Sequence, residues 1–171
     1  MNHYNQEMTV GFKEHSLTKD FILNCSSESV WDSLIRKDTF TLHQIWPYRV
    51  EFMNDGTCEM SSGEENIHHG PFMSFVGVMG TVERGCYRDL KYYYGSYFLS
   101  FRLIRPYRLQ IWVKELEDRR TAVTVRIDSY VKPYLYNAWT FMQNIFWSGF
   151  GKWIDRLTKK RIRNQEITYT N

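Results

Sequence analysis

The stretch TAVTVRIDSYVKPYLYNAWTFMQNIFWSGFGKWIDRLTKKRIR, residues 121–163, changes its hydrophobic period at Pro133. Before the proline, Val123, Val125 and Ile127 alternate with polar residues, as in a strand that buries one face. After the proline, large apolar side chains recur at steps of three and four, the spacing of an amphipathic helix. The sequence therefore predicts a strand that leads directly into one long closing helix, with those three residues facing the helix.

Further apolar segments, separated by turn residues, precede this junction. We predict strands over residues 17–25, 48–53, 57–62, 72–83, 87–94, 97–105, 108–116 and 121–131. Asn54-Asp55-Gly56 joins the second strand to the third as a hairpin turn, and residues 64–71 are predicted to form a loop. Many antiparallel strands followed by a single long helix indicate an α+β fold.

Two short helices are predicted between the first two strands. Ser26 and Ser27 are N-cap candidates for the first helix, which ends near Lys37. Asp38 is the N-cap candidate for the second helix, over residues 39–45, and Trp46-Pro47 ends that helix.

The composition is that of one folded domain. The chain has 171 residues and is 43% hydrophobic, and we assign residues 17–163 to a single domain with flexible segments at 1–16 and 164–171. Its 22 basic and 19 acidic residues leave a net charge of +3. This balance argues against nucleic acid as a partner, because nucleic-acid binding needs a concentrated basic face.

The three cysteines, Cys25, Cys58 and Cys86, are far apart in the sequence and form no C-x-x-C pair. They fit buried free thiols in a reducing compartment better than a disulfide framework or a zinc site. The first residues show no basic segment followed by an apolar run, and no apolar stretch reaches the roughly 18 residues of a spanning helix. We therefore expect a cytoplasmic protein.

The order of the predicted elements resembles that of a known superfamily. The local matches are Ser26-Ser27-Glu28-Ser29-Val30-Trp31, Trp46-Pro47, Gly80-Thr81-Val82-Glu83 and the aromatic segment 139–153. Over residues 17–160 the chain is similar to the START-like superfamily, also called SRPBCC or polyketide cyclase/dehydrase-like. The resemblance implies a helix-grip fold, in which a curved antiparallel sheet wraps around a long C-terminal helix. It also implies one strand fewer after the first than we predict, and Arg84-Gly85-Cys86 is the break that we expect to be a bulge.

A sheet wrapped around a helix can leave a cavity between the two layers. We therefore expect the protein to bind or carry an apolar, lipid-like or aromatic small molecule, without a cofactor. The expected ligand-binding residues lie on the inward face of the sheet and on the middle of the helix: Trp46, Met73, Tyr92, Tyr94, Phe101, Met142, Phe146 and Phe150.

The closing helix carries an apolar stripe formed by Leu135, Trp139, Met142, Phe146, Gly149 and Trp153. Trp139 lies in the middle of this stripe, so we expect it to be buried against the sheet. Gly149 and Gly151 lower helix propensity, which predicts either a bend in the helix or a close approach by another element.

Two other functions stay open. Glu83, Tyr92 or Tyr94 could act as acid or base groups of a cyclase/dehydratase-type enzyme in the same cavity. Alternatively, the aromatic helix could fill the cavity, and the protein would then bind protein partners through its surface, as a co-chaperone-like module does. A cavity above roughly 300 Å³ favours the first two functions over the third.

Histidines and basic residues give weaker signals. His68 and His69 are adjacent and therefore point to opposite sides, so we expect no metal site with His43 and interpret all three as exposed loop residues. The end of the closing helix gathers Lys159, Lys160, Arg161 and Arg163. These side chains form either a solvated helix end or a surface for transient contact with an anionic membrane.

Overall fold

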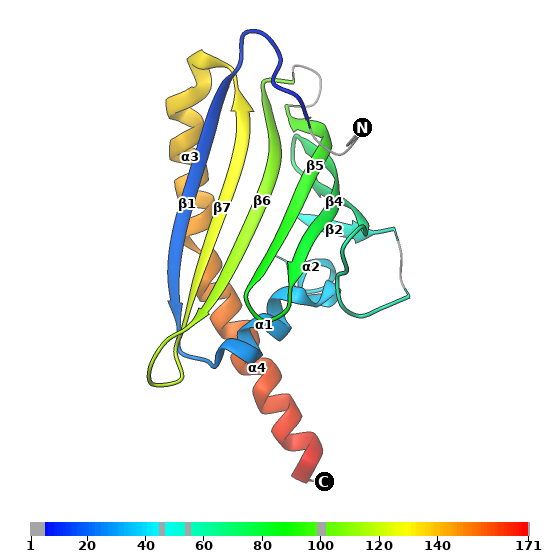
Figure 1. The fold of residues 1–171 in the computed structure, drawn as a ribbon, viewed down its shortest axis with the longest axis vertical. Helices are drawn as coiled ribbons and strands as arrows, with labels where there is room; N and C mark the ends of the chain where they lie inside the picture. Colours follow the sequence, from blue (N-terminus) through cyan, green and yellow to red (C-terminus); the bar gives the residue numbers. More distant parts are fainter. Residues whose placement is uncertain (1–5, 45–46, 54–55, 99–101, 171) are drawn as a thin grey trace.

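The computed structural model describes residues 6–44, 47–53, 56–98 and 102–170. Seven strands form one antiparallel sheet in the order β1-β7-β6-β5-β4-β3-β2 (Figure 1). The strands are β1 Lys13–Leu23, β2 Arg49–Phe52, β3 Glu65–Gly70, β4 Met73–Glu83, β5 Tyr87–Tyr97, β6 Ile104–Glu115 and β7 Thr121–Val131. The helices are α1 Ser27–Ile35, α2 Lys37–Thr41, η1 Pro133–Leu135, α3 Tyr136–Ser148 and α4 Phe150–Thr170. The predicted α+β architecture, a curved sheet packed on a C-terminal helix, is confirmed.

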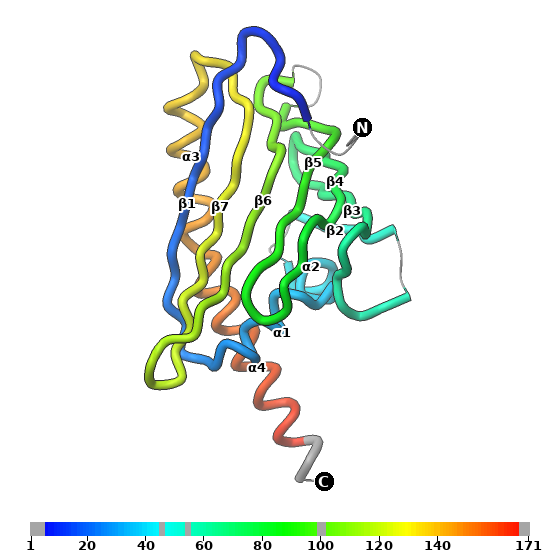
Figure 2. The backbone as a smooth tube through the Cα atoms, viewed as in Figure 1, coloured from blue at the N-terminus to red at the C-terminus, as the bar shows by residue number. Residues whose placement is uncertain are grey.

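The first and last strands lie side by side. β1 pairs with β7 along its whole length, from Lys13 opposite Val131 to Leu23 opposite Thr121. α1 and α2 carry the chain from this edge of the sheet to the opposite edge, where β2 begins (Figure 2). β1 begins inside the segment predicted as an N-terminal arm, and α4 continues to Thr170 through the predicted tail. The flexibility of the arm and the tail stays a prediction.

The closing helix is interrupted once. α3 ends at Ser148 and α4 begins at Phe150. A Cβ atom on Gly149 would meet open space, whereas one on Gly151 would lie 2.5 Å from the ring of Phe21 in β1. Gly149 therefore marks the interruption, and Gly151 lets the helix and the first strand approach closely.

The two short helices follow the prediction only in part. The Ser26 hydroxyl accepts the backbone N–H of Ser29 at 3.4 Å, so Ser26 is the N-cap of α1 as predicted. The prediction that Asp38 caps the second helix is wrong, because α2 begins at Lys37, so that Asp38 lies inside the helix, and it ends at Thr41. The Asp38 carboxylate instead accepts from Arg161 of α4 at 2.5 Å, which ties α2 to the closing helix. Arg161 therefore belongs to this contact rather than to a solvated helix end.

The prediction that residues 48–53 and 57–62 pair as a hairpin is wrong. β2 pairs with β3, residues 65–70, and not with residues 57–62, where the structure has only an isolated bridge between Arg36 and Glu59. The predicted loop 64–71 thus contains a strand. Its sequence conceals the strand because the residues that turn inward, Asn66 and His68, are polar. Asn54 and Asp55 lie outside the described residues.

The meander has one strand fewer than the sequence predicts. β6 continues through Pro106 and Tyr107, where its pairing with β7 shifts register at a β-bulge. Proline donates no hydrogen bond, so it fits the bulge without ending the strand. The bulge expected at Arg84-Gly85-Cys86 is wrong, because these residues form the turn between β4 and β5.

The core lies between the sheet and the closing helices. The three alternating residues of β7 are buried in one cluster with Trp147 and Ile154, as predicted. Trp139 is 2% exposed and packs in a separate cluster with Ile104 and Val131. The predicted burial of Trp139 is therefore confirmed.

Candidate functional site

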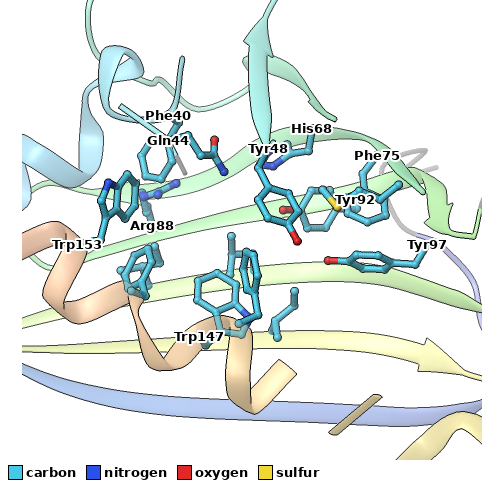
Figure 3. Close-up of a pocket in the computed structure, with 16 residues that line it drawn as sticks. Phe40, Gln44, Tyr48, His68, Phe75, Arg88, Tyr92, Tyr97, Trp147 and Trp153 are labelled. Carbon is cyan, nitrogen blue, oxygen red and sulfur yellow. The ribbon is translucent and has the colours of Figure 1, made fainter. Parts of the chain in front are cut away.

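A cavity of about 250 Å³ lies between the inner face of the sheet and the junction of α3 with α4 (Figure 3). Apolar side chains from both layers line most of it: Phe40, Phe75, Leu109, Ile111, Ile127, Trp147 and Trp153. Protein interiors normally leave few voids larger than a water molecule. An unfilled volume of this size, walled by aromatic rings, is therefore a candidate ligand site.

Half of the predicted binding residues line this cavity, namely Met73, Tyr92, Phe146 and Phe150. Two others, Trp46 and Phe101, lie outside the described residues, so their roles stay predictions. The remaining two, Tyr94 and Met142, do not line the cavity.

Tyr94 points away from the cavity and is 62% exposed. Tyr92 and Tyr94 lie opposite two adjacent residues of β4, so Tyr93 between them is an extra residue and forms a β-bulge. The bulge reverses which residues of β5 face inward from that point on. The prediction that Tyr94 shares the inward face of Tyr92 is wrong for this reason, and Tyr97 faces the cavity instead.

Met142 lies beside the buried row of α3 rather than within it. That row is Trp139, Gln143 and Trp147, at steps of four, and Met142 is 50% exposed. The polar Gln143 hides the row in the sequence, but its Oε1 accepts the indole N–H of Trp147 at 2.9 Å, so the amide is satisfied inside the core. Phe146 reaches the cavity from the margin of this row and is 42% exposed.

A second hollow of about 330 Å³ adjoins the cavity, between α3 and the loops that follow β3 and β5. Tyr48, Tyr97 and Phe146 line both hollows and therefore separate them. The rings of Tyr48 and Phe146 pack edge to face, with centroids 5.1 Å apart. Phe72 and Phe98 stack in the outer hollow with ring centroids 6.3 Å apart, and Phe72 is 75% and Phe98 39% exposed. The outer hollow thus forms an apolar passage from the surface to the side chains of Tyr48, Tyr97 and Phe146, which separate it from the cavity.

The cavity also holds polar side chains that the sequence did not predict as binding residues: Gln44, Tyr48, His68, Arg88 and Tyr97. Arg88 and Gln44 lie at the end near Trp153, and Tyr97 lies at the opposite end (Figure 3). The sequence does carry a signal for Arg88, because strand alternation places it on the same face as Leu90 and Tyr92. His68 carries no comparable signal, since its segment reads as a loop.

Arg88 is 4% exposed and has no ionic partner among the described residues. Its Nη1 lies 3.7 Å from the Met60 sulfur, and its guanidinium lies 5.0 Å from the centroid of the Phe40 ring. Its Nε has no hydrogen-bond acceptor among the described residues, and the Gln44 Oε1 likewise has no donor there. Burial lowers the pKa of Arg88 to about 10, so the guanidinium is protonated at neutral pH. Burying an ion without a partner costs several kcal/mol, so a structural role in stability does not explain Arg88.

His68 faces the cavity from β3, and its ring meets the ring of Tyr92 edge to face at 5.3 Å. Its Nε2 lies 3.0 Å from the Oδ1 of Asn66. Burial lowers the pKa of His68 to about 3, and the positive charge of Arg88 contributes in the same direction. The imidazole is therefore neutral near pH 7.

His69, the next residue, points to the other side of β3, where its Nε2 lies 3.6 Å from the Glu51 carboxylate. The two histidines do point apart as predicted, but the prediction that both lie in an exposed loop is wrong. Nowhere in residues 6–44, 47–53, 56–98 and 102–170 do three metal-ligating side chains gather.

Comparison by sequence finds no matching family model and no matching curated protein. Solved structures do match. Norcoclaurine synthase from Thalictrum flavum, in complex with dopamine and hydroxybenzaldehyde, superposes with a TM-score of 0.65 at 12% identity, over 88% of this chain and 90% of the synthase. Zhui aromatase/cyclase from Streptomyces sp. R1128 gives 0.63 at 10% identity, over 88% and 96% of the two chains. Ara h 8.0201 gives 0.61 at 11% identity, over 86% and 99%. The chain has the helix-grip fold that the sequence predicted.

The helix-grip cavity contains no carboxylate among the described residues that line it. Glu83, a predicted acid or base, is exposed at the end of β4 and does not line the cavity. Burial raises the pKa of Tyr92 and of Tyr97, so both hydroxyls stay protonated at neutral pH. The helix-grip cavity thus combines an apolar wall, one cation, a neutral imidazole and hydroxyl donors.

None of the helices in the described ranges is both long enough and apolar enough to cross a membrane.

Proposed function

We propose that this protein binds a small apolar molecule in the cavity between the sheet and the junction of α3 with α4. The observation that carries the proposal is the cavity itself, about 250 Å³ left open inside a core rich in aromatic side chains. Large side chains that could have closed the space, such as Trp147 and Trp153, instead line its wall. Filling such a space with ligand gains apolar contact that the empty protein lacks.

The size of the cavity bears on the ligand and on its entry. At about 250 Å³ the cavity does not reach the roughly 300 Å³ expected for a ligand site or an enzyme, but the interior is not solid, as a filled core would be. The volume supports a small ligand. The adjoining hollow of about 330 Å³ supports an entry route past Tyr48 and Phe146. Rotation of the partly exposed Phe146 ring would join the two hollows. A protein that binds partners only through its surface would not need this internal space.

A neutral apolar dye, N-phenyl-1-naphthylamine, tests this proposal. We expect saturable fluorescence enhancement with the full-length protein, and loss of it in Leu109→Trp, which places a larger ring in the cavity wall. Ile22→Trp is the matched control, because Ile22 is 65% exposed on β1 and its substitution leaves the cavity unchanged. Equal dye binding by both variants, each folded by circular dichroism, would contradict the proposal.

The same cavity supports a second candidate function, acid–base catalysis of the cyclase/dehydratase type. The observation in its favour is that His68 and Tyr92 meet inside the cavity. However, a histidine whose pKa is lowered to about 3 is a weak base at neutral pH, and general acid–base catalysis works best near the operating pH. We therefore place binding before catalysis. Turnover of a cyclase-type substrate that disappears in His68→Gln while dye binding persists would reverse this order.

A cytoplasmic location is part of the proposal. Its support is that Cys25, Cys58 and Cys86 are all free thiols in the structure, although the expectation that they are buried holds only for Cys25. Free thiols persist in reducing compartments. Localisation of a tagged full-length chain by fluorescence microscopy tests this point.

A further inference from the structure

Buried charges in the described part of the chain come in pairs, with one exception. Lys37 pairs with Glu64, Asp89 pairs with Arg108 at 2.8 Å, and Asp128 pairs with Arg126 at 2.9 Å. Arg88 is buried to a similar degree, yet it belongs to none of the ion pairs among the described residues. Within residues 6–44, 47–53, 56–98 and 102–170, Arg88 is therefore the buried charge that no opposite charge pairs with.

The open charge faces the cavity. Arg88 lines it, and the Nε of Arg88 is a buried donor with no acceptor among the described residues. Its nearest polar neighbours in the cavity wall offer no negative charge, since His68 is neutral and Gln44 is an amide. A negatively charged group of a ligand could therefore occupy the cavity and accept a hydrogen bond from Arg88.

We propose that the ligand is a small apolar molecule with a single carboxylate, and that this carboxylate binds the guanidinium of Arg88. The inference rests on the proposed function, because it requires that the cavity takes up a ligand. A guanidinium presents its N–H donors in a planar fork that matches a carboxylate.

The charge balance selects a monoanion. A single cation in an apolar wall neutralises one negative charge, and the described lining adds no second cation. A phosphate dianion would keep an uncompensated charge in a site of low dielectric. A neutral ligand would leave Arg88 as it is in the empty protein.

The position of Arg88 also orients the ligand. Arg88 lies at one end of the cavity and Tyr97 at the other, with the rings of Trp147 and Tyr92 between them (Figure 3). The carboxylate therefore lies near Phe40, and the apolar body extends toward Tyr97. A cavity of about 250 Å³ fits a compact aromatic acid better than a long-chain fatty acid.

Two probes of nearly equal shape test this inference, 2-naphthoate and its neutral amide, 2-naphthamide. Their dissociation constants are measured by isothermal titration calorimetry at pH 7 with the full-length protein. We expect the carboxylate to bind roughly 10- to 100-fold more tightly than the amide, as for a hydrogen-bonded charge pair. In Arg88→Met this preference should vanish while the amide still binds. Arg84→Met, which removes an exposed arginine from the β4–β5 turn, should keep the preference.

The outcomes separate the two proposals. Equal or tighter binding of the amide to the parent protein, or a preference that survives in Arg88→Met, overturns the carboxylate inference and leaves cavity binding intact. Binding of neither probe to the folded parent protein overturns both. Weaker preference in Arg84→Met than in the parent would show that overall charge, rather than Arg88, selects the anion, and would likewise overturn the inference.

Discussion

Truncation of two aromatic residues on α3 should have very different effects on stability. Trp139 is 2% exposed and packs against Tyr97, with ring centroids 4.5 Å apart. Its indole N–H has no partner among the described residues, so its loss removes packing and no hydrogen bond. Removing a fully buried large side chain costs about 3–5 kcal/mol, and we expect this for Trp139→Ala.

Phe146 is 42% exposed and one side of its ring borders the unfilled cavity. Full burial of a phenylalanine contributes about 1.5–3 kcal/mol, so the part that is covered here contributes about 1–2 kcal/mol. With a urea m-value of about 2 kcal/mol per molar, Phe146→Ala should lower the midpoint by about 0.5–1 M and Trp139→Ala by about 1.5–2.5 M.

Equilibrium urea unfolding, followed by far-UV circular dichroism, measures both shifts. Phe141→Ala is the control on the same helix, because Phe141 is 66% exposed, and its midpoint should stay near that of the parent. Equal shifts for Trp139→Ala and Phe146→Ala would refute the face assignment of α3 and the unfilled space beside Phe146.

Three further predictions concern single positions. The pKa of His68 is lowered to about 3 in the folded protein, below the ordinary value of 6.5, so the unfolded chain binds more protons between these values. Stability should be complete above about pH 6.5 and fall as the pH drops toward 3, by up to about 1.4 kcal/mol per pH unit, and His68→Gln should flatten this part of the urea-midpoint profile. Arg88→Met should leave the thermal midpoint of the empty protein unchanged or raise it, because it removes a buried unpaired charge. Gly95→Ala should cost more than about 1 kcal/mol, because Gly95 has φ +106° and a Cβ atom there would overlap the backbone of Ser74 and Phe75.

Each of these predictions can fail clearly. A pH profile that His68→Gln leaves unchanged would show that other groups govern acid destabilisation. A large drop in the midpoint of Arg88→Met would mean that Arg88 has a stabilising partner. For glycine, Gly63→Ala is a comparison with positive φ but open space around the position, and it should cost less than Gly95→Ala.

The sequence predicted the parts of the fold that depend on local periodicity. Three features could be predicted because each follows from residue spacing or from one side chain. They are the alternation in β7, the cap at Ser26 and the burial of Trp139. Gly149 and Gly151 also predicted the interruption of the closing helix and a close approach to it. One interrupts the helix and the other permits the approach of Phe21.

The errors come from register, which single-sequence patterns do not carry. The bulge at Tyr93 is defined by the pairing of β5 with β4, and it alone decides that Tyr94 faces solvent. The bulge after Pro106 depends on β7 in the same way. On α3, the inward Gln143 made the buried row look polar, so the predicted stripe was rotated toward Met142.

The candidate site was half predictable for the same reason. Aromatic residues on the inward face were expected, and Met73, Tyr92, Phe146 and Phe150 line the cavity. Arg88 was missed although it shares the face of Tyr92, because a charged residue was not expected to face inward. That exception to the usual pattern is also the strongest indication of ligand chemistry in the described structure.

The central claim is that the cavity, and not the outer hollow, takes the ligand. Intermolecular NOEs between bound 2-naphthoate and methyl-labelled full-length protein test it most directly. Ile111 and Ile127 line the cavity, whereas Ile145 lines only the outer hollow and is 58% exposed. The account predicts NOEs from the naphthyl protons to Ile111 and Ile127. NOEs to Ile145 alone, under conditions where the probe is bound, would contradict it.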